Sequence, residues 1–337
     1  MHNTPDIITF GEVLLRLSPA ENRKLTQAKS LDFFFGGTEM NVGASLAVLG
    51  ESVKHITAVS DDLVGEAALA SMRHYGLDVA DVQKVAHPIG QYILEVGSGM
   101  RSSQIAYNRL NGSFANIQPE NIAWDTIFEN AQFFHWTGIT PAISEAAYQA
   151  LKAGLVSAKE RGLQITADPA YRSNLWQYGR KGQEVLKELV SLSTIFIGGV
   201  NEINEILGTS YGLDQDGFIA ASKKLMEECP SITQIFDKIR TGMSASWQKI
   251  YGRAWVENTY FETSELEITQ VVDRIGTGDA YAAGLIYGLL HFDAEKALNF
   301  ANAACALKHT ILGDVNLVSV AEINEVMQGN TGGRIKR

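Results

Sequence analysis

Short apolar runs and longer amphipathic stretches alternate along the chain. The short runs are rich in Ile, Val and Phe, and their length is typical of buried strands, whereas the longer ones repeat apolar residues at helical spacing. The predicted strands are 6–19 (interrupted at Gly11-Glu12), 53–59, 132–139, 163–169, 193–199 and 232–238, and the predicted helices are 39–50, 63–76, 143–162, 216–229, 280–291 and 294–308. Strands that alternate with helices predict an α/β fold with a mostly parallel central sheet flanked by helices.

Two segments depart from this alternation. Residues 90–109 contain two strand-like halves around the sequence GSGMRSS, which predicts a hairpin, and residues 13–36 are strand-like without a following helix. We expect these segments to pair into a small extra sheet beside the main one. Residues 331–337 combine glycines with a basic end, which predicts a flexible tail, so residues 1–330 are expected to form a single domain.

The composition narrows the range of partners. The chain has 337 residues, of which 45% are hydrophobic, and a formal net charge of −10. This charge argues against nucleic acid or an anionic membrane as a partner, since both favour a basic surface, but it leaves small anionic substrates open. The longest apolar run, 280–290, is too short to span a membrane, and the first residues lack the pattern of a signal peptide. Because Cys229 and Cys305 give neither a disulfide framework nor a metal spacing, we expect a cytoplasmic protein with two reduced thiols.

The stretch DRIGTGDAYAAGLIYG, residues 273–288, carries the most specific chemistry in the sequence. It follows a strand-like run, and Gly276 and Gly278 would let the backbone approach a ligand closely. A helix that begins there presents unpaired N–H groups and a partial positive charge, which together bind phosphate well. Asp279 is then either an ordinary N-cap or a group that acts on the bound anion.

Other motifs for phosphate or metal binding are absent from the sequence. No Gly-Lys dipeptide occurs, which excludes a Walker A loop, and no H-E-x-x-H, H-R-D or D-F-G element is present. Tyr281 stands where G-x-G-x-x-G would need its third glycine, and the turn does not follow a first strand. A dinucleotide-dependent dehydrogenase is therefore disfavoured.

Two segments resemble signatures of the ribokinase-like, or PfkB, family of sugar kinases. DRIGTGDAYAAG resembles the C-terminal signature D-x-x-G-x-G-D-x-F-x-x-G, and GGTEMNVGASLAVLG, residues 36–50, resembles the N-terminal one. The resemblance implies a ribokinase-like three-layer sandwich in which the small extra sheet is a β-lid. It also implies that ATP, with Mg²⁺, phosphorylates a sugar hydroxyl. The GTGD turn would be the anion hole and Asp279 the general base.

Four further segments are similar to 2-keto-3-deoxygluconate kinases within that family: IAYNR, WTGITPAIS, ADPAYRSNLW and ALKHTILGD. The match implies that Gly36, Gly37, Asn41, Tyr92, Tyr107, Arg109, Arg172 and Asp314 contact the sugar, that Arg240, Gly276, Gly278 and Asn302 lie near the nucleotide, and that Gly276, Thr277, Gly278 and Asp279 form the catalytic turn. The substrate would be phosphorylated on its terminal hydroxyl. An acidic sugar fits the two arginines, because guanidinium groups bind carboxylates through paired, charge-assisted hydrogen bonds.

The sequence departs from the family pattern near the metal and the nucleotide. Asn204 stands where related kinases carry Glu, so Glu202 or Glu205 is expected to assist Mg²⁺ through water. Ala170 replaces an Asn, and residues 237–252, with Arg240 and Ser244, stand in place of a glycine-rich nucleotide loop. A requirement for a monovalent cation stays open.

Two alternatives to this function remain at this stage. The sugar could be fructose, ribose or another neutral sugar, or the chain could be an inactive sugar-binding protein that kept the kinase fold. A homo-oligomer, either a dimer or a dimer-based assembly, is expected if the lid strands leave an edge to be covered.

Overall fold

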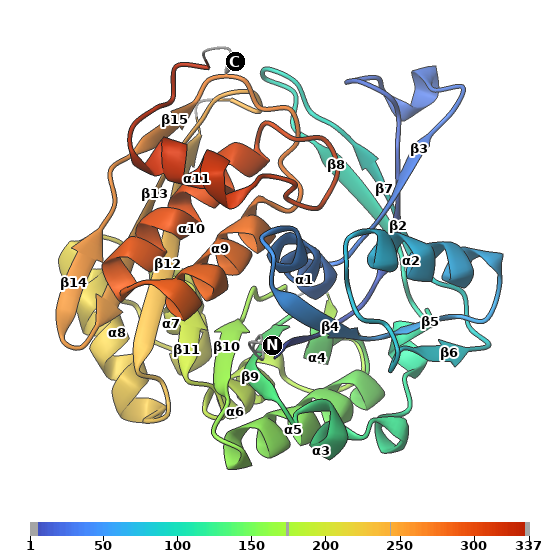
Figure 1. Ribbon diagram of the computed structural model, residues 1–337, viewed down its shortest axis with the longest axis horizontal. Coiled ribbons are helices and arrows are strands. Elements are labelled where there is room, and N and C mark those ends of the chain that lie inside the picture. Colours follow the sequence, from blue (N-terminus) through green and yellow to red (C-terminus); the bar gives the residue numbers. More distant parts are fainter. Residues whose placement is uncertain (1–5, 173–174, 243, 334–337) are drawn as a thin grey trace.

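The computed structural model describes residues 6–172, 175–242 and 244–333 and contains a nine-stranded central sheet (Figure 1). Its strand order is β14-β13-β12-β11-β10-β9-β1-β4, and β15 pairs with β13. The strands are β1 (Asp6–Phe10), β4 (Ser52–Ile56), β9 (Ala131–Thr137), β10 (Gln164–Asp168), β11 (Ile195–Ile197), β12 (Gln234–Gly242), β13 (Gln248–Val256), β14 (Thr259–Glu262) and β15 (Leu266–Ile268). The pairs from β12 to β4 are all parallel, and β13 to β15 add antiparallel strands.

Helices cover both faces of this sheet. They are α1 (Thr38–Val48), α2 (Leu63–His74), α3 (Trp124–Ile127), α4 (Thr140–Ile143), α5 (Glu145–Glu160), α6 (Gly182–Val190), α7 (Val200–Leu207), α8 (Gln215–Glu228), α9 (Thr277–His291), α10 (Ala294–Lys308) and α11 (Val320–Met327). Short 3₁₀ turns occur at Leu25–Gln27, Phe114–Asn116 and Pro119–Asn121. The expected α/β three-layer sandwich is confirmed.

Alternation along the strands separates the two cores. Ile7 belongs to the core beneath α1, α2, α9 and α10, and its neighbour Ile8 to the core beneath α3 and α5 to α8. Phe133 and Phe134 of β9 divide in the same way. Since successive side chains of a strand point to opposite faces, one apolar run supplies both layers, which explains why these strands are apolar throughout.

A second sheet of four strands stands beside the main one, at the upper right of Figure 1. We call it the lid sheet; it contains β2 (Leu14–Ser18), β3 (Asp32–Gly36), β7 (Gly90–Glu95) and β8 (Gln104–Asn108) in the order β3-β2-β7-β8. The hairpin expected at 90–109 is therefore present as β7 and β8. The segment 13–36 supplies the other two strands. A further small sheet pairs β5 (Ala58–Ser60) with β6 (Gln83–Val85).

The structure differs from the sequence-based expectation at three kinds of place. The short helices α6, α7 and α11 were not predicted, because eight or nine residues carry few turns of apolar periodicity. Residues 237–242 and 248–252 belong to the antiparallel strands β12 and β13 and not to a glycine-rich loop. Helix α9 begins at Thr277, three residues before the predicted start, so the GTGD turn is its first turn.

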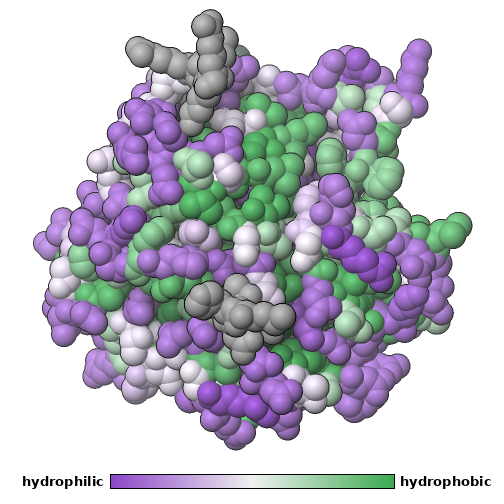
Figure 2. All heavy atoms as spheres, in the orientation of Figure 1, coloured by the Kyte–Doolittle hydropathy of each residue, from purple (hydrophilic) through white to green (hydrophobic). Residues whose placement is uncertain are grey.

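The outer surface is mostly hydrophilic on the face drawn in Figure 2, with hydrophobic atoms gathered between α11 and the lid sheet. The lid sheet also exposes apolar side chains, among them Phe33 at 62% and Tyr107 at 53%. Across 6–172, 175–242 and 244–333, no helix is long and apolar enough to cross a membrane. Of the predicted tail, Thr331–Gly333 is exposed, and 334–337 lies outside the described residues.

Candidate active site

The first turn of α9 forms a cluster of free backbone donors. Gly276 is its N-cap with φ 75°, and a Cβ there would lie 1.8 Å from the Asp314 carbonyl oxygen, so only glycine fits. Among the described residues, no acceptor is found for the backbone N–H groups of Gly276, Thr277, Gly278 and Asp279. With the positive end of the helix dipole, these groups form a site for an anion.

Asp279 lies in the first turn of α9 and does not cap it, so the N-cap interpretation is wrong. Its Oδ2 accepts a hydrogen bond of 2.7 Å from Nδ2 of Asn41, and Oδ1 of Asn41 accepts one of 3.3 Å from the N–H of Gly37. Burial raises the pKa of Asp279 to about 7; the Asn41 bond lowers it, and three nearby carboxyls add to the rise. A carboxyl with this pKa can exchange a proton near neutral pH.

A cavity of about 270 Å³ opens above this turn. It is lined from α1, the lid sheet, the segment after β10 and the loop into α9. Of the residues expected at the site, it brings together Gly37, Asn41, Tyr92, Tyr107, Arg109, Arg172, Gly276, Thr277, Gly278, Asp279 and Asp314. It therefore joins the two signature segments and the lid at one place.

Arg109 enters the cavity directly after β8 and is only 9% exposed. Its guanidinium forms a short ion pair with Glu12, a buried residue between β1 and β2 that sequence reasoning missed. Burial raises the pKa of Glu12, and the charge of Arg109 opposes this. The buried Nε of Arg109 has no acceptor within the described part of the chain, so the side chain keeps a donor for a ligand. Tyr107 lies beside it, with the guanidinium 5.6 Å from the ring centroid.

Asp314 and Tyr92 face the cavity but are also bound to each other. The Tyr92 hydroxyl donates to Oδ2 of Asp314 at 2.6 Å, and Nη1 of Arg16 donates to Oδ1 at 2.5 Å. Nη2 of Arg16 lies 2.8 Å from Oδ2 of Asp273. The fully buried Arg16 was not predicted, although a single arginine within the apolar run VLLRLS was a signal for a buried ion pair.

Cationic side chains surround the donor cluster. Nζ of Lys238, in the middle of β12, lies 3.6 Å from the place where a Cβ on Gly278 would be. Burial lowers the pKa of Arg274, and the charge of Arg240 adds to this, which places two guanidinium groups near each other. Arg172 is exposed and lines the cavity. Lys238 and Arg274 were not predicted, yet both suit an anion with several negative charges.

Glu39 is a second buried carboxyl that lines the cavity and was not predicted. It accepts hydrogen bonds from the backbone N–H and hydroxyl of Thr137 and from the hydroxyl of Thr140. Burial raises its pKa to about 7. These bonds fix the start of α1 to the end of β9, and so hold Asn41 in register with Asp279.

Five expected site residues do not line this cavity. Gly36 lies behind Asp314, because a Cβ there would be 2.4 Å from its Oδ2. Asn302 is buried in α10 and donates to Oγ1 of Thr263 at 3.0 Å. Glu202 accepts the N–H of Gly199 at the start of α7, and Arg240 and Glu205 are exposed.

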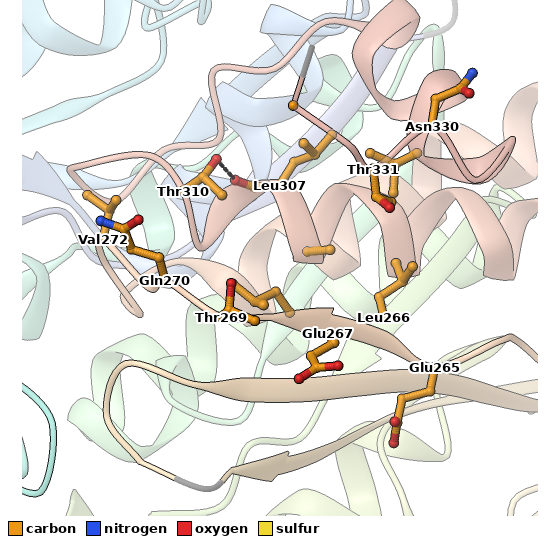
Figure 3. Close-up of a pocket in the computed structure, with 14 residues that line it drawn as sticks. Glu265, Leu266, Glu267, Thr269, Gln270, Val272, Leu307, Thr310, Asn330 and Thr331 are labelled. Carbon is orange, nitrogen blue, oxygen red and sulfur yellow. Dashed lines mark hydrogen bonds between the residues drawn. The ribbon is translucent and has the colours of Figure 1, made fainter.

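A larger cavity of about 850 Å³ lies between β15, the end of α10 and the segment after α11 (Figure 3). Leu266 points toward α10, whereas Glu265 and Glu267 point to the other side of the strand. Thr310 closes the end of α10 by donating to the Leu307 carbonyl at 2.7 Å. The loop from β15 to α9 lines this cavity with its first part and the smaller one with its second part, so the two are continuous along one segment.

Carboxylates that could serve a divalent cation are few. No group of three or more His, Cys, Asp or Glu residues with metal-binding geometry occurs in the part of the chain that the structure describes. Burial and the charge of Glu202 raise the pKa of Asp168 to about 6, and Lys238 and Arg172 oppose this. Asp168 and Glu202 disfavour each other's negative charge. Such a pair suits a divalent cation that is also coordinated by phosphate oxygens.

Comparison with known proteins agrees with this geometry. A family model for pfkB family carbohydrate kinases matches residues 4–318. The 2-dehydro-3-deoxygalactonokinase of Haloferax volcanii is 29% identical over 98% of this chain and 99% of its own. The 2-dehydro-3-deoxygluconokinase of Bacillus subtilis is 26% identical over 92% of this chain and 91% of its own.

Solved structures extend the likeness to three dimensions. The crystal structure of the 2-dehydro-3-deoxygluconokinase from Thermotoga maritima has a TM-score of 0.93 at 31% identity, covering 97% of this chain and 99% of that one. An Escherichia coli protein solved with ATP and Mg²⁺ shares the fold, with a TM-score of 0.82 at 20% identity over 96% and 99% of the two chains. The resemblance inferred from the two signatures is confirmed, and the chain belongs to the pfkB family of carbohydrate kinases, which makes it a phosphotransferase that acts on a sugar.

Proposed function

We propose that this kinase transfers the γ-phosphoryl group of ATP to the terminal hydroxyl of 2-dehydro-3-deoxygluconate, also called 2-keto-3-deoxygluconate. The observation that carries the proposal is Arg109, which is almost fully buried in the same cavity as Asp279 and keeps an unpaired donor. A neutral sugar has no use for a buried guanidinium, whereas a sugar acid offers it a carboxylate. Arg172 lines the same cavity and would be the second cation for that carboxylate.

The proposed mechanism follows from the positions of donors and charges. With its carboxylate at Arg109, the sugar extends toward α9 and brings its last hydroxyl to Asp279. Asp279 takes the proton of that hydroxyl as the oxygen attacks. The free N–H groups of the first turn of α9 and the ammonium of Lys238 stabilise the charge on the transferring group.

We assign the larger cavity to the nucleotide, because it is lined by the segment that leads into α9. ATP there would run its phosphates along residues 270–276 toward the donor cluster, with Arg240 beside them. Asn302 donates to the Ser264 carbonyl at 3.4 Å, next to the first residue of the lining. It therefore shapes this cavity from behind and does not enter it.

Asp168 and Glu202 are the residues that would hold Mg²⁺, together with water and the phosphates. Mg²⁺ usually retains several waters and takes one or two carboxylates, which suits this sparse donor set. When bound, the ion neutralises phosphate charge. Glu205, farther along α7 and exposed, is the weaker of the two glutamates that the sequence left open.

The lid sheet favours a homodimer. Its outer strands β3 and β8 are edges, and β8 is exposed along its whole length. Uncovered edge strands with apolar side chains are sites of strand pairing. Analytical ultracentrifugation should give twice the chain mass, and a monomer at all concentrations would contradict this proposal.

The experiment that tests the function is a phosphorylation screen with ATP and Mg²⁺. It should include 2-dehydro-3-deoxygluconate, its galactonate epimer, fructose and ribose, with kcat/KM as the readout. The epimer is the second candidate, because the Haloferax relative bears its name. We expect the two sugar acids to be the preferred substrates. A preference for fructose or ribose would overturn the sugar-acid assignment, and binding of sugar without turnover of any of them would favour an inactive binding protein.

A further inference from the structure

A buried lysine lies directly behind the anion-binding turn. Lys308, the last residue of α10, is 0% exposed. Its Nζ donates to the carbonyl of Ile311 at 3.0 Å, and this is the single acceptor found for it among the described residues. An ammonium group carries three donors and is rarely buried without a strong electrostatic reason.

The Lys308 side chain also touches the turn itself. A Cβ on Gly276 would lie 3.3 Å from Cε of Lys308, on the same side as the Asp314 carbonyl oxygen. Gly276 is the N-cap of α9, the residue that sets the direction of the free N–H groups. The aliphatic stem of Lys308 and the segment 311–314 therefore form the floor of the anion site.

Two loops meet at this floor. Asp273 accepts the N–H of Ile275 at 3.0 Å in its own loop and the N–H of Gly313 at 3.2 Å in the other. The His309 carbonyl accepts the N–H of Val272 at 2.8 Å. The loop that leads into α9 is thus fastened to the segment that follows α10, with the ammonium group close to the junction.

Asp273, Asp314, Arg16 and Lys308 form a buried charged cluster with two negative and two positive side chains. Asp273 and Asp314 contribute two carboxylates, and Arg16 contributes one guanidinium. Burial lowers the pKa of Lys308, while Asp273 and Asp314 oppose this and favour its charged form. Without the ammonium, Arg16 would be the one cation in the described part of the chain that is paired with these two carboxylates, which lie beside the place where a phosphoryl group must bind.

We propose that Lys308 is a built-in cation of the anion site, which fixes the two loops and offsets the Asp273 and Asp314 carboxylates so that no diffusible monovalent cation is required. It is a positioning residue, since it reaches the transferring group only through Gly276. The proposal rests on the assignment of the α9 turn as the phosphoryl site. It predicts that the enzyme works without a monovalent cation only while position 308 carries a positive charge.

The test begins with the wild-type enzyme and two variants. At fixed ionic strength, the wild-type rate should be the same in Na⁺, K⁺, NH₄⁺ and tetramethylammonium salts. Lys308→Ala should lose about 10-fold to 100-fold in kcat in tetramethylammonium, less than the about 10²–10³-fold that follows removal of a donor in direct contact. NH₄⁺ or K⁺ should restore much of this loss, because alanine leaves space for a small cation.

Lys308→Met is the matched variant, since it fills the space without charge. It should lose kcat to a similar extent and gain nothing from NH₄⁺ or K⁺, with the KM for sugar little changed. Lys187→Met, at an exposed lysine paired with Glu228, serves as the control and should behave as wild type. A wild-type enzyme that needs K⁺, or a Lys308→Met enzyme with unchanged kcat, would overturn the proposal.

A thermal-shift measurement adds a readout that needs no sugar. NH₄⁺ should raise the Tm of Lys308→Ala relative to tetramethylammonium and leave the Tm of the wild type unchanged. If no sugar is phosphorylated but this shift is present, the proposed function fails while the cation site stands. If the shift is absent in a folded Lys308→Ala protein, the cation site fails. If Lys308→Ala does not fold, Lys308→Met and the wild-type ion series decide.

Discussion

Ionisation of Asp279 destabilises the folded state, because its carboxyl is buried near three other acidic groups. Asn41 is the one side-chain donor found for it among the described residues. Its pKa is about 7 in the folded protein and about 3.9 in an unfolded chain. The unfolded form therefore loses its proton first, and the contribution of this group to stability falls as pH rises from about 4 to about 7. The raised pKa of Asp279 therefore lowers the stability of the folded protein at neutral pH and provides a base that can accept a proton there.

Asp279→Asn should fold and lose about 10²–10⁴-fold in kcat, the range typical for removal of a general base. Its Tm should exceed that of the wild type at pH 8, because the buried charge is gone, and the difference should vanish near pH 4. Calorimetry and a coupled assay give both quantities. Asp216→Asn, at an exposed position in α8, should change neither. A variant with wild-type turnover would end the role of Asp279 as the base.

The pair of Arg109 and Glu12 gives a second prediction for single residues. Arg109→Ala should weaken binding of a sugar acid by on the order of 2–5 kcal/mol and leave slow turnover of fructose nearly unchanged. It should also lower the Tm, because Glu12 then stays buried without its partner. Adding Glu12→Gln should recover much of the Tm but not the affinity. Equal loss on both sugars would show that Arg109 is structural.

At the scale of elements, the lid sheet decides access to the site. Its hairpin tip contacts the turn between β12 and β13: the N–H of Gly99 donates to Oγ of Ser246 at 3.1 Å, and the N–H of Ala245 donates to the carbonyl of Gly99 at 2.9 Å. These two hydrogen bonds join the lid sheet to the β12–β13 hairpin. Two hydrogen bonds between exposed loops are weak enough to open and close.

Amide hydrogen exchange in residues 90–109 should slow when sugar acid and a non-hydrolysable ATP analogue bind together, because closure protects the hairpin and excludes water. Exchange in the buried helix α5 gives the internal reference. Mass spectrometry of peptides from both segments measures the effect. Unchanged exchange at saturating ligand would mean that this sheet is a fixed wall.

The sequence predicted those helices and strands that have a clear apolar pattern. It did not predict features that depend on contacts between residues far apart in the chain. The six strands from β12 to β4 and the hairpin at 90–109 followed from the apolar pattern, whereas β13, β14 and β15 were not predicted. The two glycine motifs pointed to the anion site. Nothing local indicated that β2 runs parallel to β7, since that pairing depends on the central fold. Glu12, Glu39 and Lys238 were missed because the residues that they lie against are far along the chain. Arg16 was missed although its place in an apolar run was a local signal.

At the scale of the whole molecule, two cavities share the loop between β15 and α9. The two cavities have no lining residue in common, so a substitution in one should leave the other intact. The larger is lined by Ala306, Leu307 and Thr310 at the end of α10, away from the lid sheet. Such an arrangement predicts separable affinities for nucleotide and sugar.

Thr310→Trp should raise the KM for ATP strongly, because the indole occupies part of the cavity, while the KM for sugar changes little. Thr310 is exposed, so folding should tolerate the change. Thr310→Ser keeps the hydroxyl and is the matched control. Steady-state kinetics with each substrate varied in turn measures both constants. A rise in the sugar KM alone would place the nucleotide elsewhere.

The ion pair of Arg16 with Asp314 joins residues 298 positions apart. During synthesis on the ribosome, the N-terminal strands emerge long before either carboxylate partner of Arg16 has been made. The guanidinium must stay hydrated until then, because a buried charge without a partner is costly. Closure of the lid sheet onto the central sheet, and with it the first catalytic turnover, therefore has to wait until Asp314 has left the ribosome. A nascent chain of this kinase cannot act on sugar before that point.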